Sequence, residues 1–420
     1  MISTLNTFMT MNHFMLVAAG AALLMTASVS CNKFGGDDDN PYKELKLSTK
    51  SAEFVRKGSG FTFEYIDRIN ACVDEDYIIS PLSLQFLLGM ILNGAQNATA
   101  DEICSVLGYG AGETEAVNAY CLSMLEQLPE LDKKTKLSIA NAIFVQQGYP
   151  LSDSFKKRVA DHYRAELANL DFSDGAGSLK EINGWCSRQT NGLIPKVLDN
   201  VDPNMLAYLL NAMYFKGQWK DKFPKGATAE ELFTDESGTR GKVKMMKQKE
   251  LFTYTENEVF QAVRMPYGNG AFSMIALLPQ AGHTVAEITA MLKTVDWDGF
   301  RYGMDDRMVD LWLPRFETKF HIQLKEILSA MGMPLAFNPQ ADFLAMSDYA
   351  LCLGFVQQDA VIKVDEEGTE AAVVSSSGMM MDSAPAPSLP VVFHADHPFL
   401  YLIEESSSGA VLFAGRYGGK

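Results

Sequence analysis

Hydrophobic residues recur with a helical period in the first third of the chain and with a strand period in most of the remainder. Ser80 and Pro81 open the apolar run "PLSLQFLLGMILNGA", with Ser at the cap position and Pro at the first helical position. Residues 99–102, "TADE", predict a capping box before a short helix that Gly108 ends. Two further helices are predicted at residues 153–167 and 178–190.

The later part of the chain predicts strands, several of them apolar on both faces. "FSMIALLP" is an example, and such a strand suits a large sheet that is covered on both sides. Residues 267–270, "YGNG", predict a hairpin turn, and residues 241–249, "GKVKMMKQK", a half-exposed strand. The other predicted strands are residues 137–145, 205–215, 271–278, 308–313, 360–364, 389–393, 399–403 and 411–415.

Helices followed by strands indicate an α+β fold. Length alone suggests more than one domain, but no linker divides residues 51–420, so we expect a single domain there. The 420 residues are 47% hydrophobic and 21% charged, an ordinary composition for a chain that buries a large core. The net charge is −16 without a Lys/Arg cluster of the size that binds nucleic acid, so we expect no nucleic-acid partner.

The N-terminus has the pattern of an export signal. Residues 14–30, "FMLVAAGAALLMTASVS", are apolar and uncharged, which is short for a membrane span but typical of a signal peptide. Cys31 follows directly, and this arrangement resembles a bacterial lipoprotein signal, in which that Cys carries the lipid. We therefore expect a signal peptide over residues 1–30 and a membrane anchor at Cys31. A plain secretory signal and an uncleaved anchor are the alternatives.

The stretch after Cys31, "NKFGGDDDNP", is rich in Gly and Asp and ends in Pro, and it predicts a flexible acidic tether over residues 31–50. Acidic residues behind a lipidated Cys resemble the surface-export signal of some Gram-negative lipoproteins. The expected location is therefore the cell envelope, at the outer membrane or the cell surface of a Gram-negative bacterium.

A search for catalytic motifs finds none that is convincing. The chain has no HExxH, GxSxG, P-loop or C-x-x-C, and the cysteines after Cys31 are scattered. "GYGAG" (108–112) lacks the strand–turn–helix context of a dinucleotide site. His394 and His397 are close, but on a strand their side chains face opposite ways. We expect no enzyme, no cofactor and no metal; an unrecognised secreted enzyme is a weaker hypothesis.

A segment near the C-terminus has an unusual composition. Residues 364–390 read "VDEEGTEAAVVSSSGMMMDSAPAPSLP", and from Thr369 to Met381 the side chains are mostly small, with Glu370 as the one charge and no proline. Both faces of such a segment would fit between existing strands, and Gly368 in front of it is free in φ. Pro385 and the prolines after it are excluded from a central strand. This pattern predicts a segment that can be an exposed loop or a central strand; a plain loop is the alternative.

The residues around that segment resemble a known family. "EEGTEAA" (366–372) resembles the hinge of the serpins, the loop-inserting serine-protease inhibitors, and "FHADHPFLYLI" (393–403) is similar to their C-terminal signature strand. Further stretches match in family order: "ISPLSL" (79–84), "NAMYFKGQW" (211–219) and "LWLPRFE" (311–317). The resemblance implies a monomer with a serpin fold, three β-sheets with about nine helices, and an exposed reactive loop at about residues 366–390.

The resemblance also implies a mechanism and a partner. A target protease attacks the loop as a substrate and forms an acyl-enzyme, and the cut loop inserts into the main sheet before the ester is hydrolysed. The chain would thus be an irreversible suicide-substrate inhibitor of serine proteases, or also of cysteine proteases. Bulky or charged side chains would slow the insertion, which explains the small residues. A non-inhibitory serpin-fold binding protein on the cell surface is the alternative, although its hinge is expected to carry bulky, charged or Pro residues.

The resemblance assigns roles to single residues. The hinge comprises Glu366, Glu367, Gly368, Thr369, Glu370, Ala371 and Ala372. Glu366 is expected to pair with Arg315 at the top of the sheet, beside Trp219 at the insertion point; a surface pair of little energetic value is the alternative. Ser80, Ser83 and Asn211 are expected in a polar cluster beneath the sheet. The family often has His in this cluster, and the matching Gln358 hydrogen bonds but does not become charged.

Family spacing from Glu366 puts the scissile bond at Met381-Asp382 or Asp382-Ser383. The "MMM" run at residues 379–381 suits proteases with an apolar primary pocket, of the elastase, chymotrypsin or subtilisin type. Cleavage after Asp382 would imply an Asp-specific protease instead. No Arg or Lys lies between Val364 and Val392, so trypsin-like proteases are expected to be poor targets.

Overall fold

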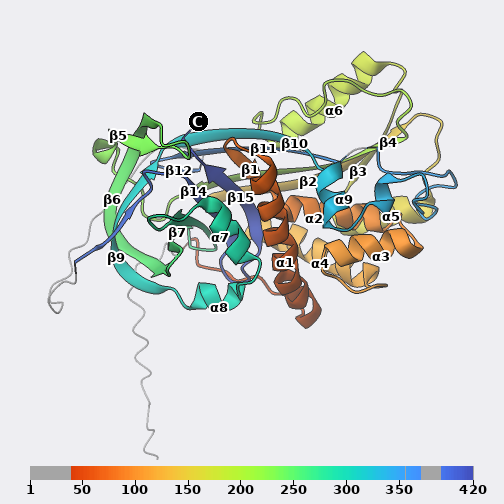
Figure 1. The fold of residues 1–420 in the computed structure, drawn as a ribbon. Helices are drawn as coiled ribbons and strands as arrows, with labels where there is room; N and C mark the ends of the chain where they lie inside the picture. The colour runs from red at the N-terminus through yellow and green to blue at the C-terminus, as the bar shows by residue number, and fades with distance from the viewer. Residues whose placement is uncertain (1–38, 355, 370–388, 420) are drawn as a thin grey trace, which may run out of the picture. The chain divides into compact units, whose positions relative to one another are not determined.

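The computed structural model describes residues 39–354, 356–369 and 389–419, all of which lie in one compact unit. Figure 1 shows long strands that cross this unit with helices packed against them. Nine α-helices lie in the described ranges: α1 (Thr49–Cys72), α2 (Pro81–Leu92), α3 (Asn97–Val106), α4 (Thr114–Gln127), α5 (Asp153–Tyr163), α6 (Gly175–Gln189), α7 (Val285–Leu292), α8 (Trp297–Tyr302) and α9 (Lys325–Met331).

One sheet has six strands in the order β10-β11-β12-β4-β2-β3. Figure 1 shows α6 on one face of this sheet and α2 on the other. Ile182 and Trp185 of α6 pack in a small core with residues of β2 and β4, whereas the opposite face belongs to the main core. The strands are β10 (Phe316–Gln323), β11 (Gln357–Asp365), β12 (Gly368–Thr369), β4 (Ala207–Gln218), β2 (Thr135–Gln146) and β3 (Glu166–Leu170).

The second sheet has nine strands in the order β1-β15-β14-β8-β7-β6-β9-β13, with β5 beside β6. The resemblance implies three sheets, but hydrogen bonds join the described strands into two. The reason is the long β6, which pairs with β5 at its start, with β9 along its middle and with β7 at its end. The strands are β1 (Tyr77–Ile79), β15 (Val411–Tyr417), β14 (Phe399–Glu405), β8 (Phe272–Pro279), β7 (Phe260–Tyr267), β6 (Arg240–Glu256), β9 (Asp305–Pro314), β13 (Val391–His394) and β5 (Ala229–Thr234).

The helix predicted after Ser80 is confirmed as α2. The Ser80 hydroxyl accepts the backbone N–H of Ser83, and Pro81 occupies the first turn. Every residue of α2 is buried, because the helix packs on β4 of one sheet and on β15 of the other. A helix that is apolar all round suits this central position.

Two local predictions are wrong. The capping box at residues 99–102 does not form, because α3 begins at Asn97 and the Thr99 hydroxyl accepts the backbone N–H of Asp342, while the Glu102 carboxylate accepts that of Leu335. The helix predicted over residues 153–167 is too long. α5 ends at Tyr163, since Arg164 adopts a left-handed conformation with φ 49° and β3 begins at Glu166.

The chain from Asn40 onward is bound to the fold, although we expect a flexible tether up to residue 50. Asn40 is buried, and its side-chain amide donates to the Asp132 carboxylate at 2.7 Å. The backbone N–H of Lys46 donates to Gln127, and that of Leu45 donates to the Ser407 hydroxyl. These bonds fix the path of the chain just before α1.

Two features are missing from the described part of the chain. Among its helices, none is both long enough and apolar enough to cross a bilayer. Its His, Cys, Asp and Glu side chains form no group of three or more that could hold a metal ion.

Candidate functional site

Among the described residues, a gap separates β4 from β11 inside the six-stranded sheet. At one end β12 pairs with both strands, and Thr369 lies opposite Val364 of β11 and Gly217 of β4. Beyond Thr369, no described strand lies between β4 and β11, and these strands do not pair with each other in the described residues. Where β12 pairs with both strands, β4 and β11 are two strand spacings apart, about 9–10 Å. One further strand would fill the gap, which we describe from its upper end at β12 to its lower end.

The upper end requires glycine at position 368. Gly368 has φ 148°, and a Cβ there would overlap the Gly217 carbonyl oxygen and lie 2.7 Å from the Cα of Gln218. Neither the backbone angle nor the space allows a side chain. The chain therefore turns into the gap at the glycine that the sequence places in the hinge.

Thr369 is held by a pair of stacked aromatic rings. Its hydroxyl lies 2.9 Å from that of Tyr267, whose ring stacks on Trp219 with the centroids 4.4 Å apart. The indole N–H of Trp219 donates to the Asp365 carbonyl at 2.9 Å, and its backbone N–H donates to that of Glu367 at 2.9 Å. Burial raises the pKa of Tyr267, so its hydroxyl is neutral. Trp219 thus fastens the turn that leads from β11 into β12.

Glu366 lies in that turn and binds Arg315. Its side chain is 4% exposed, whereas that of Arg315 is 47% exposed. The Arg315 guanidinium and the Thr228 hydroxyl both donate to the Glu366 carboxylate, the second at 2.7 Å. Burial raises the pKa of Glu366, but these two hydrogen bonds outweigh it and hold the pKa below its usual value. The carboxylate is buried, while its partner is half in solvent.

Glu367, the next residue, is held by two lysines. Lys222 and Lys225 donate to its carboxylate at 2.7 and 2.8 Å, and these bonds lower the pKa of Glu367. Sequence reasoning missed both lysines and Thr228. The available signal was the basic stretch "WKDKFPKGAT", which follows directly on Trp219.

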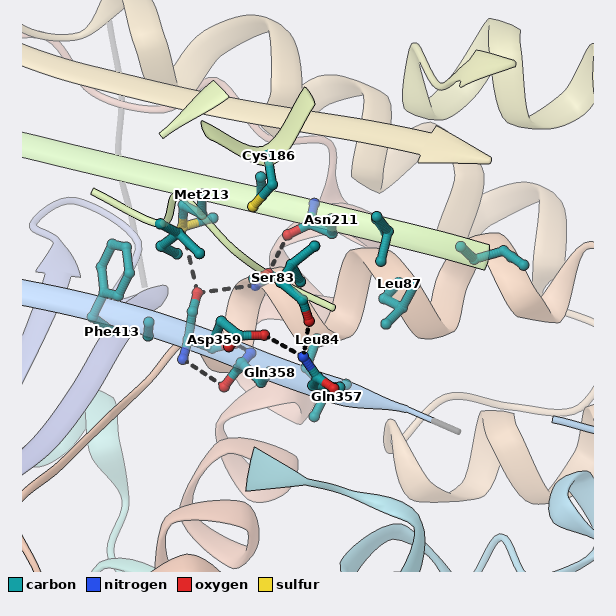
Figure 2. Close-up of a pocket in the computed structure, with 17 residues that line it drawn as sticks. Ser83, Leu84, Leu87, Cys186, Asn211, Met213, Gln357, Gln358, Asp359 and Phe413 are labelled. Carbon is teal, nitrogen blue, oxygen red and sulfur yellow. Dashed lines mark hydrogen bonds between the residues drawn. The ribbon is translucent and has the colours of Figure 1, made fainter. Parts of the chain in front are cut away.

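A polar cluster lies under the middle of the gap (Figure 2). The Ser83 hydroxyl donates to the side-chain oxygen of Asn211 on β4. On β11, the Gln358 side chain accepts the backbone N–H of Ser80 at 3.0 Å and donates to its carbonyl at 2.9 Å. The Ser80 hydroxyl donates to the Leu412 carbonyl at 2.7 Å. Both borders of the gap are therefore hydrogen bonded to the start of α2.

Two more residues complete this cluster and were missed by sequence reasoning. Tyr65 of α1 donates its hydroxyl to Gln358 at 3.0 Å, and Asn141 of β2 accepts the Asn211 amide at 2.7 Å. Neither lies near a recognisable motif, so only the fold brings them together. Gln358 has four hydrogen-bonding positions at most, and three of them are occupied by these protein groups.

The remaining candidate residues lie outside the described part of the chain, and their roles stay predictions. They are Glu370, Ala371 and Ala372 of the hinge, Met381, Asp382 and Ser383 around the scissile bond, and Cys31 at the lipidation site.

Comparison with known proteins gives consistent matches over most of the chain. The sequence model of the family described as serpin (serine protease inhibitor) matches residues 56–418. Neuroserpin of Gallus gallus is 32% identical over 354 residues, which cover 82% of this chain and 86% of that protein.

Two solved structures share the fold. A thermophilic serpin, tengpin, in the native state matches with a TM-score of 0.78 at 30% identity, over 91% of this chain and 97% of that one. The cleaved form of serpin 42Da matches with a TM-score of 0.80 at 27% identity, over 89% of this chain and 100% of that one. Serpins are generally protease inhibitors that act by insertion of the cleaved loop, and they are mostly not catalysts. The chain belongs to the serpin family.

Proposed function

We propose that this chain is an inhibitory serpin that traps a serine protease by inserting its cut reactive loop into the gap between β4 and β11. The observation that carries this proposal is the gap itself. At its upper end it is one strand wide, because Gly368 and Thr369 pair there with both neighbouring strands. A chain that continues from Thr369 needs no rearrangement of the sheet edges to add one strand.

The proposed reaction uses the catalytic Ser of the protease as the nucleophile. Its hydroxyl oxygen forms an ester with the carbonyl carbon at the scissile bond, near Met381-Asp382 or Asp382-Ser383, and the new amino group leaves with the downstream chain. Insertion of residues from Thr369 to about Met381 then carries the esterified protease along the sheet before water hydrolyses the ester. Each inserted residue gains backbone hydrogen bonds to β4 and β11, which drives the process.

The loop composition supports a target with an apolar primary pocket. Met379–Met381 precede the proposed cut, and no Arg or Lys lies between Val364 and Val392. We therefore propose elastase-, chymotrypsin- or subtilisin-like proteases as targets.

We also propose that the protein acts as a monomer, anchored by a lipid at Cys31 on the outer membrane or the cell surface. The support is the apolar run that ends at Cys31 and the acidic stretch behind it. The test is expression in a Gram-negative host fed labelled palmitate: wild-type protein should incorporate label and Cys31→Ser should not. Label in neither protein would remove the anchor from the proposal without affecting inhibition.

The inhibitory function is tested by mixing the protein with pancreatic elastase and, separately, with subtilisin, and analysing the products under denaturing conditions. We expect an SDS-stable adduct of serpin and protease with one of them. Cleaved serpin without any adduct would contradict inhibition. The competing proposal, a non-inhibitory binding protein, is separated by heat: insertion predicts a markedly higher melting temperature after loop cleavage, and a non-inserting loop predicts no change.

A further inference from the structure

An apolar cavity lies at the lower end of the gap. Its volume is about 320 Å³, and it is bordered by the start of β4 and by the segment that leads into β11. Its floor carries buried apolar side chains from α2 and from residues 343–346: Leu87, Ile91, Phe343 and Met346. Leu87, Leu209, Leu210 and Gln357 line both this lower cavity and the pocket around the polar cluster, so the two spaces are adjacent.

The pairing of β12 sets a register that can be continued along the gap. Thr369 lies opposite Gly217 of β4 and opposite Val364 of β11, and both pairings are antiparallel. Each further residue of the loop would therefore lie opposite the preceding residue of β4 and the preceding residue of β11. Continued along the gap, this register would bring Ser375 level with Asn211 and Gln358 at the same time, and Met379 level with Ala207.

The alternation of a strand then decides which side chains face α2. Asn211 and Gln358 point to α2, because they bind Ser83 and Ser80. Side chains directly opposite each other in a sheet lie on the same face, so Ser375 would face α2, and so would Met379 four residues on. Glu370 and Met380 would face α6 instead.

The loop residues then match the surroundings that they would meet. Ser375 would reach the polar cluster, and Met379 would reach the apolar floor of the lower cavity. Glu370, the one charge of the segment, would lie between Lys216 of β4 and Lys363 of β11. A shift by one residue would remove all of these matches, because it moves every side chain to the other face.

From these matches we propose that the lower cavity binds the Met379 side chain after the loop is cut, in the register set by β12. This inference rests on the proposed function. An unbranched thioether side chain adapts well to an irregular apolar cavity of this kind. The "MMM" run would thus serve protease recognition and, through Met379, would also fill the lower cavity at the end of the inserted strand.

The test compares Met379→Asp with the matched control Met380→Asp, which places the same change one residue further, on the opposite face. Each protein is cut with subtilisin, and mass spectrometry confirms a cut after Met381 or later. The melting temperature is measured before and after the cut, so that any difference between the uncut forms cancels. We expect the same rise in Met380→Asp as in the wild type, and a rise smaller by several degrees in Met379→Asp. Met379→Leu should restore the full rise.

Equal rises in the two Asp variants would contradict the binding of Met379 in the lower cavity and the register that leads to it, while leaving inhibition intact. No rise in the wild type would overturn the proposed function as well. The two failures are therefore distinguishable in one experiment.

Discussion

The two sheets of the protein differ in how completely their strands are paired. In the nine-stranded sheet, β8, β14 and β15 are buried along their whole length and pair with a neighbour on both sides. In the six-stranded sheet, β4 and β11 are paired on their outer sides but leave the gap between them. The side chains of β8, β14 and β15 are mostly apolar and packed in the core, whereas the gap is bordered by the hydrogen bonds of Ser83, Asn211 and Gln358.

This difference suggests that the nine-stranded sheet stays fixed while the six-stranded sheet gains a strand. Apolar packing tolerates little change in shape, so it suits the part that does not move. Hydrogen bonds can exchange partners at small net free energy, so they suit the place where a strand is added. Changes in the nine-stranded sheet should therefore lower the stability of the uncut protein, and changes at the gap should alter what happens after cleavage.

The largest effect is expected from Thr369→Arg. Thr369 is buried against Tyr267, and an arginine there would have to bury a charge before the rest of the loop could follow. We expect the SDS-stable adduct to fall at least about tenfold, with cleaved serpin in its place, measured by gel densitometry. Leu389→Arg is the matched control, because Leu389 is 92% exposed and lies beyond the segment that inserts. Equal trapping by both variants would contradict insertion through β12.

Gly415→Ala should destabilise the fixed sheet. A Cβ at Gly415 of β15 would overlap the Tyr401 hydroxyl and lie 2.5 Å from the Tyr77 carbonyl oxygen. Such overpacking typically costs about 1–3 kcal/mol, and this loss should be seen in the urea unfolding of the uncut protein. Gly226→Ala serves as the control, since a Cβ there meets nothing within 4 Å. Comparable stability of the two variants would be inconsistent with a tightly packed nine-stranded sheet.

Arg315→Met should have a smaller effect on the uncut protein. It leaves the buried Glu366 carboxylate with the Thr228 hydroxyl and without its cation. Because Arg315 is half-exposed, we expect a loss of only about 1 kcal/mol in urea unfolding. Arg307→Met on β9 removes an exposed arginine whose nearest carboxylate oxygen, on Asp305, is 3.8 Å away, and it should change nothing. The same small loss in both variants would show that the Glu366 pair is an ordinary surface pair.

The pH dependence of these contacts should give the smallest effect. The pKa values of Glu366 and Glu367 are lowered in the folded protein. Their contribution is therefore complete above the unfolded Glu pKa of about 4.3, and it is lost as the pH falls below that value and through the lowered folded pKa. The melting temperature of the wild type should exceed that of Glu366→Gln/Glu367→Gln at pH 7, and this difference should shrink below about pH 4.3. A difference that stays constant down to pH 3 would contradict the assignment; Glu250→Gln, at an exposed site, is the control.

Features that depend on neighbouring residues in the sequence were predictable. Ser80 and Pro81 start α2 as expected, because a cap is formed within one helical turn. The apolar run of β8 is buried on both faces, as its pattern indicates. The "YGNG" turn joins β7 to β8, with Gly268 and Gly270 at positive φ.

Contacts between distant segments could not be predicted in the same way. Thr99 and Glu102 have the spacing of a capping box, yet they bind Asp342 and Leu335. Lys222 reaches Glu367 across 145 residues of sequence, and no local pattern indicates this bond. The likeness to serpins located Arg315 near Glu366, but the gap beside them became visible only in the pairing of the strands.

The central claim is that the cut loop becomes a strand between β4 and β11. Hydrogen–deuterium exchange of the uncut and the cleaved protein, read by mass spectrometry, tests it most directly. We predict that cleavage slows exchange in three peptides together: residues 207–217 of β4, residues 357–364 of β11 and residues 370–381 of the loop, while β8 and β14 do not change. Unchanged exchange in β4 and β11 after cleavage would contradict the claim.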